Sequence, residues 1–107
     1  MTEDGWVRLA ASDAVRQGRV TVVRVGIRQL GATRIAGAVH AFRNPCPHAG
    51  APLSGGELRG TTIVCSRHGW AFDVVTGACP AHPIYSLSRI EVREVEGSVF
   101  ARLPPED

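Results

Sequence analysis

The chain has 107 residues, the length of one compact domain, and its 44% hydrophobic and 21% charged residues are close to globular averages. Twelve Arg, with no Lys, against ten Asp and Glu give a net charge of +2, which argues against a nucleic-acid binder that depends on phosphate neutralisation. The chain has four His and only three Cys, and because so few cysteines, odd in number, do not suit a disulfide framework, reduced thiols or metal ligands are expected.

Alternation of apolar and polar residues with a period of two dominates both ends of the chain and predicts an all-β fold. The strands expected in the first part of the chain cover residues 6–10, 19–25, 27–36 and 38–43. A break is possible at Gly31, and segment 12–18 is the one expected helical turn, with Ser12 as N-cap and Gly18 as its end. The last part predicts a hairpin of residues 89–93 and 99–103 around a turn at Glu96-Gly97.

Residues 44–83 have a different character. They are rich in Gly and hold five of the seven Pro, all three Cys and three of the four His. Such a segment is expected to be rich in turns, with short strands near 57–59, 63–65 and 71–73 that position loops. We therefore expect a β framework from both ends of the chain around a loop-rich insert.

Targeting signals and membrane spans are not expected. The N-terminus is acidic and lacks the basic and apolar regions of a signal peptide, and the apolar runs are far shorter than the ~20 residues of a membrane span. The sequence therefore predicts a cytoplasmic protein with no membrane partner.

The insert carries two short motifs that combine a thiol with an imidazole. They are Cys46-Pro47-His48 and Cys65-Ser66-Arg67-His68, and residues 53–64 between them are long enough to run out and back as a small hairpin. Two such turns facing one another offer two sulfur and two nitrogen ligands. One Cys or His alone is more often structural, but four at paired short spacings favour a metal site.

Zinc and an iron–sulfur cluster both accept these ligands. Zinc fingers usually pair Cys with Cys and His with His along the sequence, whereas here each loop contributes one of each. That order suits a two-iron cluster with both Cys on one iron and both His on the other. A structural zinc-binding module that mediates interactions stays as an alternative.

The two motifs, with Gly69-Trp70 and Phe72-Asp73 after them, resemble those of Rieske [2Fe–2S] proteins, specifically the ferredoxins of multicomponent ring-hydroxylating oxygenase systems. The resemblance covers nearly the whole chain. It implies a single Rieske domain, 1–107, with a β-sandwich-like base (1–43 and 84–107) and a small loop-rich cluster-binding subdomain (44–83).

The same resemblance implies one [2Fe–2S] cluster per chain and assigns its ligands. Cys46 and Cys65 would hold the inner iron, and His48 and His68 the outer iron near the surface. With every iron position filled by protein ligands and bridging sulfides, the chemistry would be one-electron transfer rather than catalysis.

Two further comparisons within the family concern the potential. Respiratory Rieske proteins carry an additional disulfide between the ligand loops, and the matching positions here are Ala51 and Arg67. They also carry a Ser and a Tyr whose hydroxyls donate to sulfurs, where this chain has Trp70 and Phe72. Because fewer donors disfavour the added negative charge of reduction, we expect a potential of roughly −150 mV, the low end of the Rieske range.

The function implied is a soluble carrier, not an enzyme, that passes electrons from a flavin-dependent ferredoxin reductase to a terminal oxygenase by transient docking. The chain is too short to hold the oxygenase's own catalytic iron domain. The alternative within the family is a Rieske-like small subunit of a larger reductase such as nitrite reductase. Such subunits often lack cluster ligands, and all four are present here.

Three other residue types in or near the insert are expected to be structural. Cys79 is interpreted as a packed or partly exposed free thiol, and His40 and His82 as structural or solvated, although His82 could lie near a docking face. Asp73 is expected to fix the loop near His68 rather than to act as an acid or base.

Overall fold

The computed structural model describes residues 5–47 and 50–103, and within them the all-β prediction is confirmed. The strands are β1 (Trp6–Ala11), β2 (Thr21–Val25), β3 (Arg28–Ile35), β4 (Ala38–Arg43), β5 (Glu57–Arg59), β6 (Thr62–Val64), β7 (Ala71–Asp73), β8 (Arg89–Val95) and β9 (Ser98–Arg102). Two 3-10 turns accompany them, η1 (Ser12–Ala14) and η2 (Leu53–Gly55). No helical segment among the described residues is long and apolar enough to cross a membrane.

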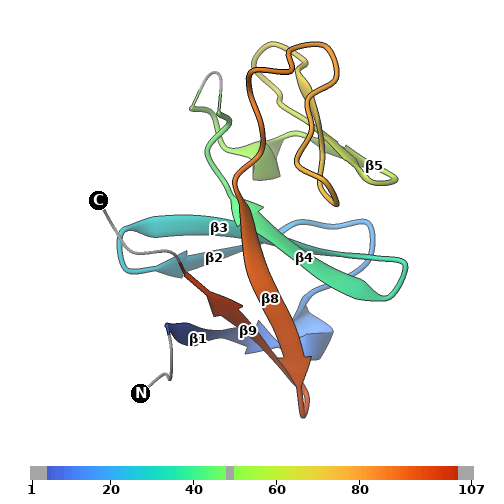
Figure 1. The fold of residues 1–107 in the computed structure, drawn as a ribbon. Helices are drawn as coiled ribbons and strands as arrows, with labels where there is room; N and C mark the ends of the chain where they lie inside the picture. The colour runs from blue at the N-terminus through green and yellow to red at the C-terminus, as the bar shows by residue number, and fades with distance from the viewer. Residues whose placement is uncertain (1–4, 48–49, 104–107) are drawn as a thin grey trace.

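The strands form two antiparallel sheets at opposite ends of the molecule (Figure 1). A six-stranded sheet has the order β1-β9-β8-β4-β3-β2, so the first and last strands of the chain pair with each other, and a three-stranded sheet has the order β5-β6-β7. We call the six-stranded sheet with η1 the base. Each sheet has its own apolar core: one is centred on Leu30, Ala41 and Val99 in the base, the other on Leu53, Ile63 and Phe72.

Two tight turns join neighbouring strands of the base. Ala36 and Gly37 join β3 to β4, and Glu96 and Gly97 join β8 to β9; all four residues have positive φ. Two central residues with positive φ are typical of type I′ turns, whose twist matches that of the flanking strands. The turn predicted at Glu96-Gly97 is therefore confirmed.

Two local predictions were wrong. Ser12 is the first residue of η1 rather than its N-cap, and the cap position, Ala11, makes no side-chain hydrogen bond. Strand β3 runs unbroken through Gly31, which pairs with Phe42 on β4. A Cβ at Gly31 would lie 2.5 Å from the Phe42 ring, so this glycine makes room for an aromatic side chain and does not end a strand.

Arg34 joins four parts of the base. Its Nε donates to the Val15 carbonyl, and its terminal nitrogens donate to the carbonyls of Ser12 and Gly37 and to both carboxylate oxygens of Glu94. All five N–H groups of the guanidinium are thereby used. The hydrogen bonds with Glu94 hold the pKa of the Arg34 guanidinium above its usual value. The same bonds hold the pKa of the Glu94 carboxyl below its usual value.

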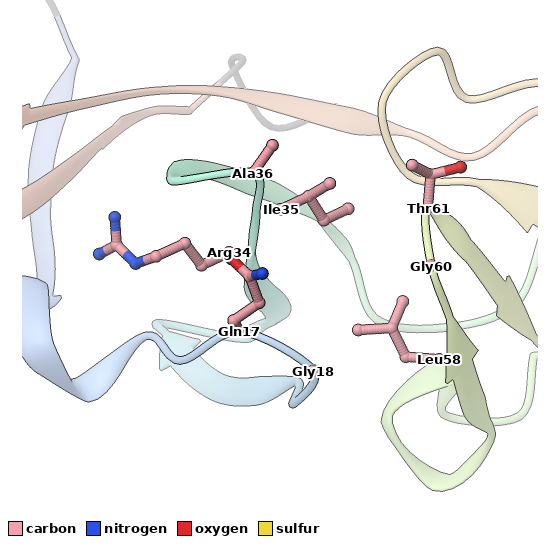
Figure 2. A pocket seen from close by; sticks show the side chains of 8 residues that line it. All are labelled: Gln17, Gly18, Arg34, Ile35, Ala36, Leu58, Gly60 and Thr61. Atoms are coloured by element: carbon pink, nitrogen blue, oxygen red, sulfur yellow. The ribbon is translucent and has the colours of Figure 1, made fainter.

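A pocket of about 220 Å³ lies between the base and the β5–β6 turn. Figure 2 shows Ile35 and Leu58 pointing toward one another across it, while the Arg34 guanidinium extends away. Because the donors of Arg34 are already used inside the base, no charged group of the lining faces the space. The pocket is a seam between the two sheets and has no features of a ligand site.

Candidate cluster site

Two turns with the same main-chain hydrogen bonds carry the candidate cysteines. In the first, the Cys46 N–H donates to the Ala51 carbonyl (2.8 Å) and the Gly50 N–H donates to the Cys46 carbonyl (2.8 Å). In the second, Cys65 donates to Trp70 (2.8 Å) and Gly69 donates to Cys65 (2.9 Å). Both glycines have positive φ, at 73° and 75°, which an L side chain rarely adopts. Each turn therefore presents its Cys from the same backbone geometry.

A third turn repeats this geometry with a carboxylate in place of the thiol. The Asp73 N–H donates to Ala78 (2.8 Å), and the Gly77 N–H, from a residue with φ of 85°, donates to the Asp73 carbonyl (2.7 Å). Asp73 Oδ1 accepts the N–H groups of Val75 (2.8 Å) and Thr76 (3.0 Å). The amides of this turn therefore point toward the Asp73 side chain and stabilise its negative charge.

The electrostatics of the third turn show what such a turn does. Hydrogen bonds from the Thr76 and Val75 amides, with one from the Thr61 hydroxyl to Oδ2, hold the pKa of Asp73 below its usual value although burial opposes the shift. An anionic sulfur at Cys65 would meet a similar amide arrangement, because its turn shares the main-chain hydrogen bonds of the Asp73 turn. The donor set therefore fits a group that binds thiolates.

The predicted ligands differ in exposure. The Cys46 and Cys65 side chains are buried, at 3% and 1% exposure, and neither forms a disulfide with another described residue. His68 is exposed at the tip of the second turn, and His48 lies outside the described residues. Within the described part of the chain, no three His, Cys, Asp or Glu residues gather around one point as ligands of a single metal ion do.

Asn44 anchors the first turn to the base, a role that was not predicted from the sequence. This residue is 1% exposed, its amide donates to the side chains of Gln29 (3.2 Å) and Ser54 (3.1 Å), and its Oδ1 accepts the Ser54 N–H (2.9 Å). Its main chain also bonds to Gln29 and Leu53. An Asn directly after a strand and two residues before Cys46 was the available signal.

A third loop, between β7 and β8, packs against the second turn. The imidazole of His82 stacks on the Trp70 indole with ring centroids 3.5 Å apart and planes 9° from parallel, and Tyr85 meets the same indole edge-on at 5.2 Å. Cys79 in this loop is 2% exposed. The reading of Cys79 as a packed thiol agrees with this burial, and His82 lies beside the turn that carries His68.

His40 lies apart from these turns, on β4 of the base opposite Thr33. Burial, reinforced by the nearby charge of Arg89, lowers the pKa of its imidazole below the usual value. A structural role, as the sequence predicts, is consistent with this position.

Comparison with known families identifies the chain's relatives. The family model of the Rieske [2Fe-2S] domain matches residues 5–91. Ferredoxin CarAc of Metapseudomonas resinovorans is 35% identical over 97 residues, which cover 89% of this chain and 91% of the relative. The ferredoxin component of the naphthalene 1,2-dioxygenase/salicylate 5-hydroxylase systems of a Ralstonia species is 33% identical, covering 78% of this chain and 80% of the relative.

Solved structures give the same result at the level of the fold. The ferredoxin of Sphingomonas yanoikuyae B1 matches with a TM-score of 0.83 and 31% identity, covering 92% of this chain and 98% of that one. A chain from the complex of reduced oxygenase and oxidised ferredoxin in carbazole 1,9a-dioxygenase matches with a TM-score of 0.82 and 33% identity, covering 94% of both. The fold of this chain is therefore that of these ferredoxins.

Proposed function

The chain belongs to the Rieske [2Fe–2S] domain family, and on that premise we propose that it is the ferredoxin of a ring-hydroxylating oxygenase system, passing single electrons to a terminal oxygenase. Relatives of nearly the same length carry this role, and a matching ferredoxin has been solved in complex with its oxygenase. The chain is an electron-transfer component and not itself a catalyst.

Its single [2Fe–2S] cluster is held, in this proposal, by Cys46, His48, Cys65 and His68. The observation that carries the assignment is the shared hydrogen-bond pattern of the two Cys turns, because it presents two buried thiols from equivalent backbones. When bound, such a cluster supplies reversible one-electron chemistry. The division into a base of 1–43 and 84–107 and a cluster-binding subdomain of 44–83 is supported by two apolar cores, although Phe42 and Leu87 of the base ranges pack in the core of the cluster-binding side.

One side of the proposed cluster site is covered by apolar residues, and the other side is exposed at His68. Leu53, Ile63 and Phe72 pack around the two thiols and keep water from that side. His68 lies exposed, so a partner can approach the imidazole without rearrangement of the core. Electron transfer at a single exposed edge suits short encounters with more than one protein.

A low potential and a flavoprotein reductase as electron donor complete the proposal. Trp70 and Phe72 have no hydroxyl to donate to a sulfur, which supports a value of roughly −150 mV. The three cysteines form no disulfide among the described residues, which is compatible with the reducing cytoplasm, where we place the protein.

The test is purification after expression with ample iron. The protein should be red-brown, should contain iron and sulfide in equal amounts, and should bleach when dithionite reduces it by one electron. With a purified oxygenase and reductase, turnover should require this chain. A colourless protein that retains zinc would contradict the proposal.

A further inference from the structure

The loops that carry the candidate cysteines are almost free of charge. We define the tip loops as residues 44–47, 50–56, 64–70 and 78–88, and Figure 1 shows the loops between β6 and β8 at the end of the molecule away from β1 and β9. Among the twelve Arg and ten Asp and Glu of the chain, the tip loops contain one residue, Arg67. Any charge recognition by the tip loops themselves therefore depends on a single guanidinium.

Arg67 is exposed and lies next to His68. It forms no ion pair or side-chain hydrogen bond with any residue that the structure describes, unlike Arg34 and Arg59, which pair with Glu94 and Glu57 at 2.9 Å. The guanidinium is thus available to a partner, and its planar fork matches a carboxylate with two parallel hydrogen bonds.

An exposed apolar residue lies on the neighbouring tip loop. Ile84 is 89% exposed, the highest value among the large hydrophobic residues. It lies two residues after His82, and Arg67 lies three residues before Trp70, so the His82–Trp70 stack holds the two segments together. A cation and an apolar side chain are therefore presented from loops that pack on one another.

We propose that Arg67 and Ile84 form the recognition surface for the terminal oxygenase, which must offer a carboxylate beside an apolar recess. The inference rests on the proposed function and adds the chemistry of the partner's surface. A basic partner surface would find no anion in the tip loops, whereas an acidic one gains attraction at the point nearest His68. Apolar contact at Ile84 would then slow dissociation.

Charged oxidants test the charge without any protein partner. The dithionite-reduced holoprotein is mixed with ferricyanide, an anion, or hexaammineruthenium(III), a cation; each takes one electron from the cluster. Because both reactions share one donor, the ratio of their rates cancels any change in driving force. Arg67→Gln should lower the anion-to-cation ratio about tenfold at low salt, and Arg67→Lys should retain it.

The matched control is Arg24→Gln on β2, which removes the same charge from an exposed position of the base. It should change the ratio by less than Arg67→Gln does at every salt concentration, and by less than about twofold at about 0.1 M salt, where exposed charges are screened beyond about 10 Å. An equal effect of Arg24→Gln and Arg67→Gln would overturn the proposal, because net charge alone would then explain it.

The protein partner is tested with the oxygenase whose turnover depends on this chain. Arg67→Gln should lower the second-order rate of oxygenase reduction about tenfold at low salt and flatten its salt dependence, while Ile84→Gln should lower the rate without changing that dependence. Unchanged rates, or a loss seen only with the reductase or in self-association, would overturn the assignment. A wild-type chain that keeps the oxidant preference but reduces no oxygenase would instead contradict the proposed function.

Discussion

The base and the tip loops are built from the same chain by different means. The base is held by long strand pairs, with β1 on β9 and β3 between β2 and β4, and by the Arg34 guanidinium. The tip loops have few strand pairs and depend on short turns, a buried Asn44 and a stack of Trp70 on His82.

The contrast separates what stabilises the fold from what positions the site. Strand pairing and burial in the base need no cofactor, whereas two turns of the tip loops each present a thiol whose charge would have to be neutralised by a bound group. Substitutions in the base should therefore change stability with little effect on the cluster, and substitutions in the turns should do the reverse.

The largest effect is expected from Cys65→Ser. Loss of a thiolate ligand should abolish the visible absorption of the cluster, while far-ultraviolet circular dichroism keeps the β signal of the base. Cys79→Ser is the matched control, since this thiol is equally buried but is not a proposed ligand. Retention of the cluster in Cys65→Ser, or its loss in Cys79→Ser, would contradict the ligand assignment.

Arg34→Met tests whether the base determines stability without affecting the cluster. The substitution removes the hydrogen bonds that Arg34 donates to Glu94 and to the carbonyls of Ser12 and Val15, so we expect the free energy of unfolding to fall by about 2 kcal/mol. Denaturation by urea measures the loss, and the cluster spectrum should be unchanged. A bleached cluster with normal stability would show that base and tip are coupled.

Asp73→Asn should act mainly on the third turn, residues 73–78, which leads into the tip loop of residues 78–88. Replacing the carboxylate by an amide weakens the hydrogen bonds that Val75 and Thr76 donate. We expect this to lower the stability of the turn by about 1 kcal/mol. Because the folded pKa of Asp73 lies below its unfolded value of about 3.9, its contribution is present above that pH and is lost as the pH falls through the folded pKa.

The measurement is cluster lifetime against pH in the wild type and Asp73→Asn. The wild type should lose its advantage over the variant in acid. Asp13→Asn, an exposed aspartate of η1, is the control and should behave as wild type. Equal lifetimes for Asp73→Asn and the wild type at neutral pH would remove Asp73 from the account.

The smallest effect is expected for His40 in the base. Its pKa is lowered by burial, so the folded state binds its proton less readily than the unfolded chain, and stability falls as the pH drops below about 6.5. His40→Gln should flatten this part of the stability profile measured with urea. An unchanged slope would place the titration elsewhere.

Local patterns predicted most of this molecule, and the errors arise where distant residues decide. Alternation located β1, β4 and the β8–β9 hairpin, and the clearest cases are residues two apart that share one core, Val39 with Ala41 and Val99 with Ala101. Gly31 suggested a break because its reason for being glycine, the Phe42 ring, comes from the neighbouring strand. The stack of Trp70 on His82 likewise joins two loops whose contact no period reveals.

The third turn could have been found from the sequence. Cys46, Cys65 and Asp73 are each followed four residues later by a glycine with positive φ, so the spacing repeats three times. A search for metal ligands recognises only the first two. The role expected for Asp73, fixing a loop, agrees with the bonds that it accepts inside its own turn.

The central claim is that the two Cys turns hold a [2Fe–2S] cluster without the hydroxyl donors that raise its potential. An anaerobic potentiometric titration of the purified protein, followed by visible absorption, tests both parts at once. We expect one reversible one-electron transition at roughly −150 mV. A clearly positive midpoint potential, or an absorption that does not respond to reduction, would contradict the account.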